Sequence, residues 1–171
     1  MKTSPVIKKQ RTVAFFAGSF DPFTRGHESI VLRALHLFDE VIIAIGVNPS
    51  KHEWMPVEER VRLIETAFAH EPRVRVVTYD GLTVKAAQHH KANFLLRGVR
   101  TTQDFEYEKQ LAEVNRDLSG LETVLLYTLP EDAHVSSTMV RDLAGHGQNV
   151  AQYLPRGVNL NKNNYDGEDN E

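Results

Sequence analysis

Short apolar runs rich in β-forming residues alternate along the chain with longer segments whose apolar residues recur at helical spacing. We interpret five of these runs as strands, at residues 12–17, 41–47, 74–78, 94–96 and 123–129. Strands that alternate with helices in this way form right-handed β-α-β units and a parallel sheet. The pattern therefore predicts an α/β protein with a Rossmann-like, doubly wound, parallel five-stranded sheet and helices on both faces.

The helical segments are recognised by apolar residues three and four positions apart. The first helix is expected to begin near Gly26, Pro56 opens a second, and a shorter one spans residues 82–90. A fourth follows Arg100 and a fifth follows His134. The apolar residues that define the longer ones are Ile30, Val31, Ala34, Leu35 and Phe38; Val57, Val61, Ile64 and Phe68; Tyr107, Leu111, Val114 and Leu118; and Val140, Leu143 and Ala144.

Length and composition fit a single domain. The chain has 171 residues, of which 41% are hydrophobic, and this is enough for one full-sized core. We expect residues 1–11 to be an N-terminal extension and residues 12–155 to form the α/β domain. Residues 156–171 become too polar and acidic to pack, which predicts a disordered tail.

Charge and cysteine content exclude several classes of protein. The formal net charge of -3 argues against nucleic acid as a partner, because affinity for a phosphate backbone normally shows as a basic surplus. The absence of cysteine excludes disulfides, a thiolate nucleophile and a Cys-containing zinc site. The longest apolar runs are strand-sized and residues 1–10 lack the hydrophobic core of a signal peptide, so we expect no membrane association and a cytoplasmic location.

The run from Gly18 to His27 follows the first predicted strand and opens the first predicted helix. Backbone N–H groups in the first turn of a helix are unpaired and attract phosphate, and Gly18 allows close approach of the backbone to a ligand. Ser19 and Thr24 add hydroxyls, and His27 can point a ring N–H at a phosphoryl oxygen. An ordinary turn with Thr24 as a helix cap is the alternative. We interpret the run as a nucleotide phosphate site.

A cluster of charged residues follows the fourth predicted strand. Arg97 and Arg100 flank Gly98 at its carboxyl end, while Asp104 and Glu108 share a face of the next helix. Two guanidiniums in this place can clamp phosphate groups, because arginine matches phosphoryl oxygens in a planar fork. A solvated surface pair between Arg100 and Asp104 is the alternative. Two arginines beside another candidate phosphate site favour the clamp.

Three hydroxylated residues in succession, Ser136 to Thr138, open the last predicted helix. One serine would be explained by helix capping alone. The additional donors, together with the N-terminus of the helix, indicate a site for the β- and γ-phosphates of a nucleotide.

These stretches together resemble the bacterial-type phosphopantetheine adenylyltransferase family of the nucleotidyltransferase superfamily. The resemblance covers residues 13–155 and depends on residues 18–27, 48–51, 96–108 and 135–138; residues 24–27 are similar to the superfamily's T/H-x-G-H signature. It implies a nucleotidyltransferase that transfers the adenylyl group of ATP to 4'-phosphopantetheine in coenzyme A biosynthesis, giving dephospho-coenzyme A and pyrophosphate. It also implies a homohexamer and coenzyme A as a candidate feedback ligand.

The resemblance also assigns roles to residues. It implies catalytic roles for His27, Lys51 and Arg100, and room for adenine at Gly26. The residues that correspond to the family's ATP contacts are Ser19, Phe20, Gly26, His27, Gly98, Val99, Arg100, Glu108, His134, Val135, Ser136, Ser137 and Thr138. Those that correspond to its contacts with phosphopantetheine are Ser19, Lys51, Thr83 and Arg97.

Two positions depart from the family pattern. Family members usually have threonine where this chain has Ser19, so the hydroxyl is kept without the methyl group that restricts its rotamer. Thr83 replaces a larger apolar residue where the family contacts the pantetheine arm. Asp21 and Glu53 have no family role and are interpreted as loop charges.

The expected chemistry needs no catalytic triad. A phosphate monoester is already an anion at neutral pH, so direct in-line attack on ATP requires alignment and compensation of charge rather than a general base. Mg²⁺ is expected to bind mainly through the ATP phosphates with several waters, because the sequence offers no carboxylate cluster that would cage it. No protein metal ligand is predicted. The remaining histidines lack metal-ligand spacing and are interpreted as structural or solvated; they are His36, His52, His70, His89, His90 and His146.

Two alternative functions remain at this stage. A nicotinate or nicotinamide mononucleotide adenylyltransferase shares several of the motifs and would place a base-stacking aromatic in the acceptor loop, where this chain has Trp54. Lys51 and the cluster between Arg97 and Glu108 favour phosphopantetheine instead. A non-catalytic nucleotide sensor is the second alternative, and the presence of both His27 and Arg100 argues against it.

Overall fold

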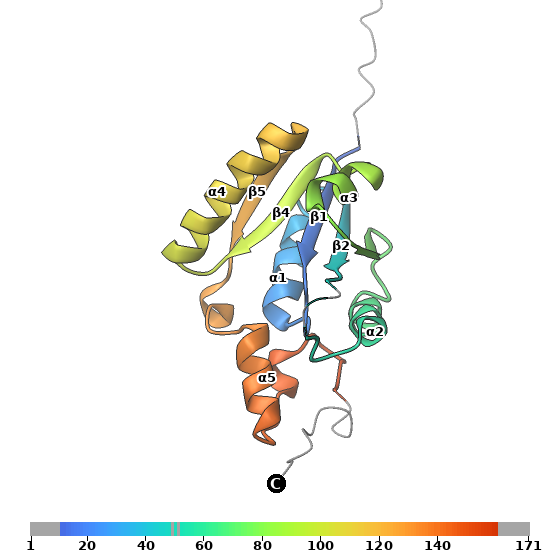
Figure 1. Ribbon diagram of the computed structural model, residues 1–171. Coiled ribbons are helices and arrows are strands. Elements are labelled where there is room, and N and C mark those ends of the chain that lie inside the picture. The colour runs from blue at the N-terminus through green and yellow to red at the C-terminus, as the bar shows by residue number, and fades with distance from the viewer. Residues whose placement is uncertain (1–10, 49, 51, 161–171) are drawn as a thin grey trace, which may run out of the picture.

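The computed structural model describes residues 11–48, 50 and 52–160. A five-stranded sheet lies at the centre, with every neighbouring pair of strands parallel and the order β3-β2-β1-β4-β5 (Figure 1). The strands are β1 Val13–Gly18, β2 Glu40–Gly46, β3 Val74–Tyr79, β4 Phe94–Val99 and β5 Glu122–Tyr127. The predicted doubly wound sheet is therefore confirmed. β4 continues to Val99 instead of ending at residue 96, so Arg97 and Gly98 belong to the strand itself.

In the described residues, four α-helices cover the faces of the sheet and a fifth lies beyond its edge. α1 and α2 pack on one face, α3 and α4 lie on the other, and α5 sits beyond the carboxyl ends of the strands (Figure 1). No helix in the described residues combines the length and apolar character that a membrane crossing requires. The helices are α1 Arg25–Ala34, α2 Val57–Ala67, α3 Thr83–His89, α4 Thr102–Ser119 and α5 Ser137–Gly145, with short 3₁₀ turns at Pro130–Asp132 and Ala151–Tyr153.

Alternation along the central strands divides the core into two layers. In β1, Ala14 and Phe16 face α1 and α2, whereas Val13, Phe15 and Ala17 face α3, and all five are buried. A strand buried on both faces reads as a continuous apolar run, as is usual in parallel sheets. The central strands are thus rigid supports for the loops at their carboxyl ends.

α4 has its apolar stripe on the outside. Tyr107, Val114 and Leu118 are 64%, 53% and 63% exposed, while Glu108 is the buried residue of this helix. The periodicity correctly predicts the helix, but three of its four stripe residues point outward, Leu111 is only partly buried, and the one fully buried residue is the charged Glu108. The reason is Arg97 on β4, which recruits the carboxylate of Glu108 to the protein interior.

The packed chain extends beyond the predicted domain boundary at residue 155. Val158 is buried in the main core, and Leu160 packs against the same cluster. The expectation of a disordered tail is therefore wrong for residues 156–160, because Val158 is buried and Leu160 is partly buried in an otherwise polar segment. The rest of the predicted tail, and residues 1–10 of the predicted extension, lie outside the described residues.

The last residue of β1 must be glycine for a packing reason. A Cβ atom on Gly18 would lie 2.9 Å from two ring atoms of Phe20. The ring cannot swing away, because Phe20 is 3% exposed and packs against the rings of Phe16 and Phe23. This corrects the sequence interpretation of Gly18, since the space beside it is occupied by the protein's own side chain rather than left for a ligand.

We predict that Gly18→Ala lowers the free energy of unfolding by about 1–3 kcal/mol, the usual range for overpacking a filled interior. Chemical denaturation with a fluorescence or circular dichroism readout measures this change. Gly145→Ala is the matched control, because nothing lies within 4 Å of a Cβ atom there and alanine favours the helix. Equal stabilities of the two variants would contradict the packing argument.

Candidate active site

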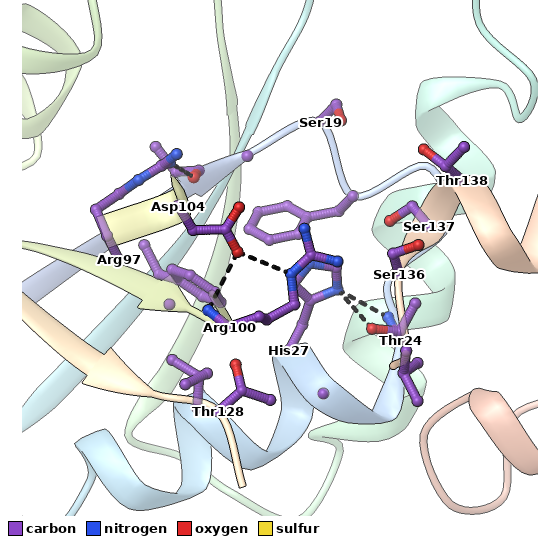
Figure 2. A pocket seen from close by; sticks show the side chains of 18 of the residues that line it. Ser19, Thr24, His27, Arg97, Arg100, Asp104, Thr128, Ser136, Ser137 and Thr138 are labelled. Carbon is purple, nitrogen blue, oxygen red and sulfur yellow. Dashed lines mark hydrogen bonds and ion pairs between the residues drawn. The ribbon is translucent and has the colours of Figure 1, made fainter. Parts of the chain in front are cut away.

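The candidate site lies where the strand order reverses, between the carboxyl ends of β1 and β4. Ligands bind at such switch points because the loops from adjacent strands diverge there. A cavity of about 360 Å³ opens at this point (Figure 2). The sequence-predicted residues that line it are Ser19, Phe20, Gly26, His27, Arg97, Gly98, Arg100, Glu108, Val135, Ser136, Ser137 and Thr138.

His27 is oriented by the backbone at the start of α1. The backbone N–H of Thr24 donates to Nδ1 of His27 at 3.0 Å, and the Thr24 hydroxyl oxygen lies 3.0 Å from the same nitrogen (Figure 2). A backbone N–H can only donate, so Nδ1 is the acceptor and the hydrogen of the neutral ring is on Nε2. The ring also packs edge-on against Phe20, with centroids 5.2 Å apart. His27 therefore offers the cavity a fixed Nε2–H donor.

The charge state of His27 follows from its surroundings. Burial, with smaller contributions from the cationic Arg100 and Arg97, lowers the pKa of His27 from 6.5 to about 4. The imidazole is therefore neutral at physiological pH. A neutral ring can donate one hydrogen bond to a phosphoryl oxygen. When no ligand is bound, it also avoids placing an unpaired positive charge in a buried position.

Arg97 is held in a bidentate ion pair. Its Nε and Nη2 donate to the two carboxylate oxygens of Glu108 at 2.8 and 2.6 Å, and Nη1 donates to the carbonyl of Ala17. All three contacts fix the guanidinium beside the end of β1, with 29% of the side chain exposed. The resemblance places Glu108 among the ATP contacts; in this structure its carboxylate is used to hold Arg97.

Arg100 pairs with Asp104, as the alternative interpretation from the sequence had it. Nε of Arg100 and its backbone N–H both donate to the same carboxylate oxygen at 3.1 Å (Figure 2). The pair is exposed enough to be weak, so a more highly charged phosphate can compete with it. Both side chains line the cavity.

The hydroxyls at the start of α5 have unequal tasks. Ser136 caps the helix by accepting from the backbone N–H of Met139 at 3.1 Å, and the Ser137 hydroxyl donates to the carbonyl of Pro22 at 2.8 Å. Thr138 accepts a hydrogen bond from Arg141. The hydroxyl hydrogen of Ser137 is therefore already used in a hydrogen bond. The hydroxyls of Ser136 and Thr138 accept in these contacts, so their hydrogens can be donated to a ligand.

Besides Gly18, two more glycines line the cavity, and their surroundings differ. A Cβ atom on Gly98 would lie 3.2 Å from Ile30, a tight contact that a small shift of the Ile30 side chain would have to relieve. A Cβ atom on Gly26 would lie no closer than 3.7 Å to any protein atom, which is ordinary contact. Space at Gly26 is therefore not demanded by the protein's own packing.

A second, smaller cavity of about 260 Å³ adjoins the first. Ala17, Gly18, Ser19 and Arg97 line both cavities. Thr83 lines the second one, where its hydroxyl lies 2.9 Å from that of Tyr79. Tyr79 is a residue that the sequence analysis missed, since nothing in β3 distinguishes it from an ordinary strand tyrosine.

Two predicted residues in the described part of the chain are not brought into these cavities by their side chains. Val99 is 1% exposed and faces the core. His134 is exposed and packs its ring edge-on against Tyr153. Lys51 lies outside the described residues, so its proposed role stays a prediction.

Arg60 and Asp21 also were missed as site residues. Arg60 is 1% exposed and donates to the carbonyl of Ser19 at 2.9 Å. Asp21 is 8% exposed and accepts from the backbone N–H groups of Trp54 and Met55, at 2.9 Å each, so it is not a loop charge. A signal existed for Arg60, because it falls on the apolar stripe of its helix, three residues after Val57.

Comparison with known proteins agrees with this geometry. A family model described as cytidylyltransferase-like matches residues 15–143. A phosphopantetheine adenylyltransferase of Phocaeicola vulgatus is 51% identical over 147 residues, covering 86% of this chain and 97% of that protein. One of Flavobacterium johnsoniae is 49% identical over 149 residues, covering 87% and 98%. The chain belongs to the phosphopantetheine adenylyltransferase family.

One solved structure is similar in fold to this chain. It is a bifunctional NMN adenylyltransferase/ADP ribose pyrophosphatase from Francisella tularensis, complexed with AMP and a manganese ion. The TM-score is 0.65 at 18% identity, and the match covers 87% of this chain and 46% of the other. At this level of identity the likeness concerns the fold alone.

The carboxylates of the site do not form a cage for a cation. Asp104 and Glu108, which line the cavity, are both paired with arginines. In the part of the chain that the structure describes, no three His, Asp or Glu side chains gather as metal ligands. The carboxylates of Asp104 and Glu108 serve in this structure as partners of arginines.

The depressed pKa of His27 predicts how stability depends on pH. Between pH 6.5 and about 4 the unfolded chain binds a proton at His27 that the folded chain excludes. The free energy of unfolding should therefore fall as the pH is lowered through this window, by on the order of 2–3 kcal/mol relative to His27→Gln. Denaturant titrations of both proteins at pH 7, 5.5 and 4 measure the difference. Parallel pH profiles for the two proteins would show that His27 titrates normally.

Proposed function

We propose that this protein transfers the adenylyl group of ATP to 4'-phosphopantetheine and releases dephospho-coenzyme A and pyrophosphate. The observation that carries the proposal is the pair of adjoining cavities that share Ser19 and Arg97, with the His27 Nε2–H donor in the larger one. ATP occupies the larger cavity and the pantetheine arm the smaller. Family membership and the names of the relatives support the same substrates.

The two phosphates meet at the shared wall. Arg97 and Lys51 hold the phosphate of the acceptor, while Arg100, Ser136 and Thr138 contact the phosphates of ATP. An oxygen of the acceptor phosphate attacks the α-phosphorus, a new P–O bond forms, and the bond to the β-phosphate oxygen breaks. The leaving group is pyrophosphate, and no proton has to be removed from the nucleophile.

The protein accelerates this step by alignment and by charge compensation. The Nε2–H of His27 donates to the α-phosphoryl oxygens, where negative charge increases in the transition state. Its lowered pKa keeps it a neutral donor over the physiological range. Mg²⁺ bound to the ATP phosphates would supply further charge neutralisation.

A mononucleotide acceptor is less well supported. The base of such an acceptor needs an aromatic side chain to stack on, and Trp54 is the aromatic nearest the acceptor loop. Trp54 packs against the main core, and its backbone is tied to Asp21. It lines neither of these two cavities but a third one, which Ser19 also lines.

Assembly and location complete the proposal. We propose a cytoplasmic homohexamer, with coenzyme A as a feedback ligand that competes through the pantetheine arm it shares with the substrate. The outward apolar stripe of α4 supports self-association, because Tyr107, Val114 and Leu118 are largely exposed in the single chain. The number six rests on the family resemblance.

Incubation of the purified protein with ATP and 4'-phosphopantetheine should yield dephospho-coenzyme A and one pyrophosphate per turnover, measured by mass spectrometry and a coupled pyrophosphate assay. Nicotinamide mononucleotide in place of 4'-phosphopantetheine should yield no dinucleotide. Turnover with nicotinamide mononucleotide and none with 4'-phosphopantetheine would reject the proposed acceptor.

His27→Ala should lower kcat by at least about a hundredfold and change the Kd of ATP much less, because a donor aimed at developing charge acts mainly in the transition state. Steady-state kinetics and ATP titration calorimetry measure the two effects. His36→Ala is the matched control, since His36 is an exposed histidine two residues beyond the end of α1. A kcat near that of the control would remove His27 from the mechanism.

A single in-line attack should invert the configuration at the α-phosphorus. The cavity supplies donors but no activated nucleophile, so no adenylylated enzyme is expected. Reaction of one α-thio-ATP diastereomer, with the product configuration read by ³¹P NMR, tests this. Retention of configuration would mean two displacements and a covalent intermediate.

A further inference from the structure

A buried arginine on α2 ties together two loops of the site. Arg60 has a side chain that is 2% exposed, and burial of a guanidinium costs several kcal/mol unless it is paired. Its Nη1 donates to the carbonyl of Ser19 at 2.9 Å, and its Nη2 forms an ion pair with Glu53. Both partners lie on loops at the carboxyl ends of β1 and β2, and neither is in the hydrophobic core.

The bond to the Ser19 carbonyl fixes an unusual backbone conformation. Phe20 has a φ of +48°, in the left-handed region that residues other than glycine rarely adopt. The orientation of the Ser19–Phe20 peptide plane sets this angle, and the carbonyl of that plane is the atom that Arg60 holds. Strained conformations of this kind persist only where surrounding contacts over-determine them.

Ser19 is the point at which three cavities meet. It lines the two described above and a third one of about 620 Å³, bounded by the loop after β2 and by α5, which Arg60 also lines. The ring of Phe20, next in the chain, packs on His27. Because contacts with Phe16, Phe23 and His27 fix this ring, a shift of the Ser19–Phe20 peptide would displace chiefly the shared hydroxyl.

Asp21 makes a second tie between the same loops. Its carboxylate accepts the backbone N–H groups of Trp54 and Met55, which directly follow Glu53. Arg60 thus acts within a double connection that keeps the loop after β2 in register with the turn after β1.

We propose that Arg60 is a positioning residue for adenylyl transfer, which acts by holding the Ser19 carbonyl and hence the Ser19 hydroxyl at the shared wall of the cavities. This inference rests on the proposed function. It assigns Arg60 no contact with either substrate.

Three variants separate the contacts of Arg60. Arg60→Met keeps the length of the side chain and removes both contacts, Arg60→Lys keeps the charge but replaces the planar fork by one ammonium, and Glu53→Gln leaves the bond to Ser19. Arg62→Met is the matched control, an exposed arginine two residues along the same helix.

We expect Arg60→Met to lower kcat/KM for 4'-phosphopantetheine by about ten- to a hundredfold per folded enzyme, with a Kd of ATP within about threefold of the wild type. Arg60→Lys should be intermediate, and Glu53→Gln and the control should stay within about threefold. The folded fraction is measured by calorimetry or circular dichroism under assay conditions. A loss that disappears after this correction would overturn the inference and leave Arg60 a stability residue.

A double-mutant cycle with Ser19→Ala provides the decisive readout. If Arg60 acts through Ser19, Arg60→Met or Arg60→Lys costs at most about threefold more once the hydroxyl is gone. An equal cost in both backgrounds would overturn the inference. Should Arg60→Met not fold, the cycle with Arg60→Lys decides the question alone. Failure of the wild type and of Arg62→Met to make dephospho-coenzyme A would instead reject the proposed function.

Discussion

The hydrogen bond from the backbone of Thr24 to Nδ1 of His27 is the constraint on which the site depends. It satisfies one of the unpaired donors at the start of α1, and it determines which ring nitrogen faces the cavity. Protonation of His27 would place two donors against each other at Nδ1. Together with burial, this geometry favours the neutral ring, in agreement with the lowered pKa. One contact therefore links the helix terminus, the tautomer and the charge state of the proposed donor.

Charge in this protein is placed rather than abundant. The chain is negative overall, yet the candidate site is rich in arginine. The arginines around it face carboxylates in the absence of ligand, in the pairs Arg25–Asp132, Arg60–Glu53, Arg97–Glu108 and Arg100–Asp104. Each carboxylate holds a planar guanidinium in place and offsets the repulsion between neighbouring arginines. The more exposed pair at Arg100 can open for a phosphate, whereas the other pairs keep their arginines, Arg97 included, in fixed positions.

Glycine stands at different positions of the site for different physical reasons. A side chain at Gly18 would collide with Phe20 and one at Gly98 would press on Ile30, whereas a Cβ atom at Gly26 would make only ordinary contacts, with Asp132 and Thr24. Sequence motifs record all three positions equally. Only the positions of the neighbouring side chains distinguish packing from possible ligand space.

The sequence by itself determined the fold class, because strands buried on both faces and helices with one apolar stripe leave a periodicity that can be read directly. It also predicted that Ser19, Arg97 and Ser136, which are far apart in the chain, line one cavity, since the carboxyl ends of parallel strands share an edge. It did not reveal that most of the apolar stripe of α4 faces outward, that Val158 is buried, or that Arg60 and Asp21 hold the site loops. Those features depend on partners far apart in the chain, such as Arg97 with Glu108 and Arg60 with Ser19, and only the tertiary structure decides which distant groups meet.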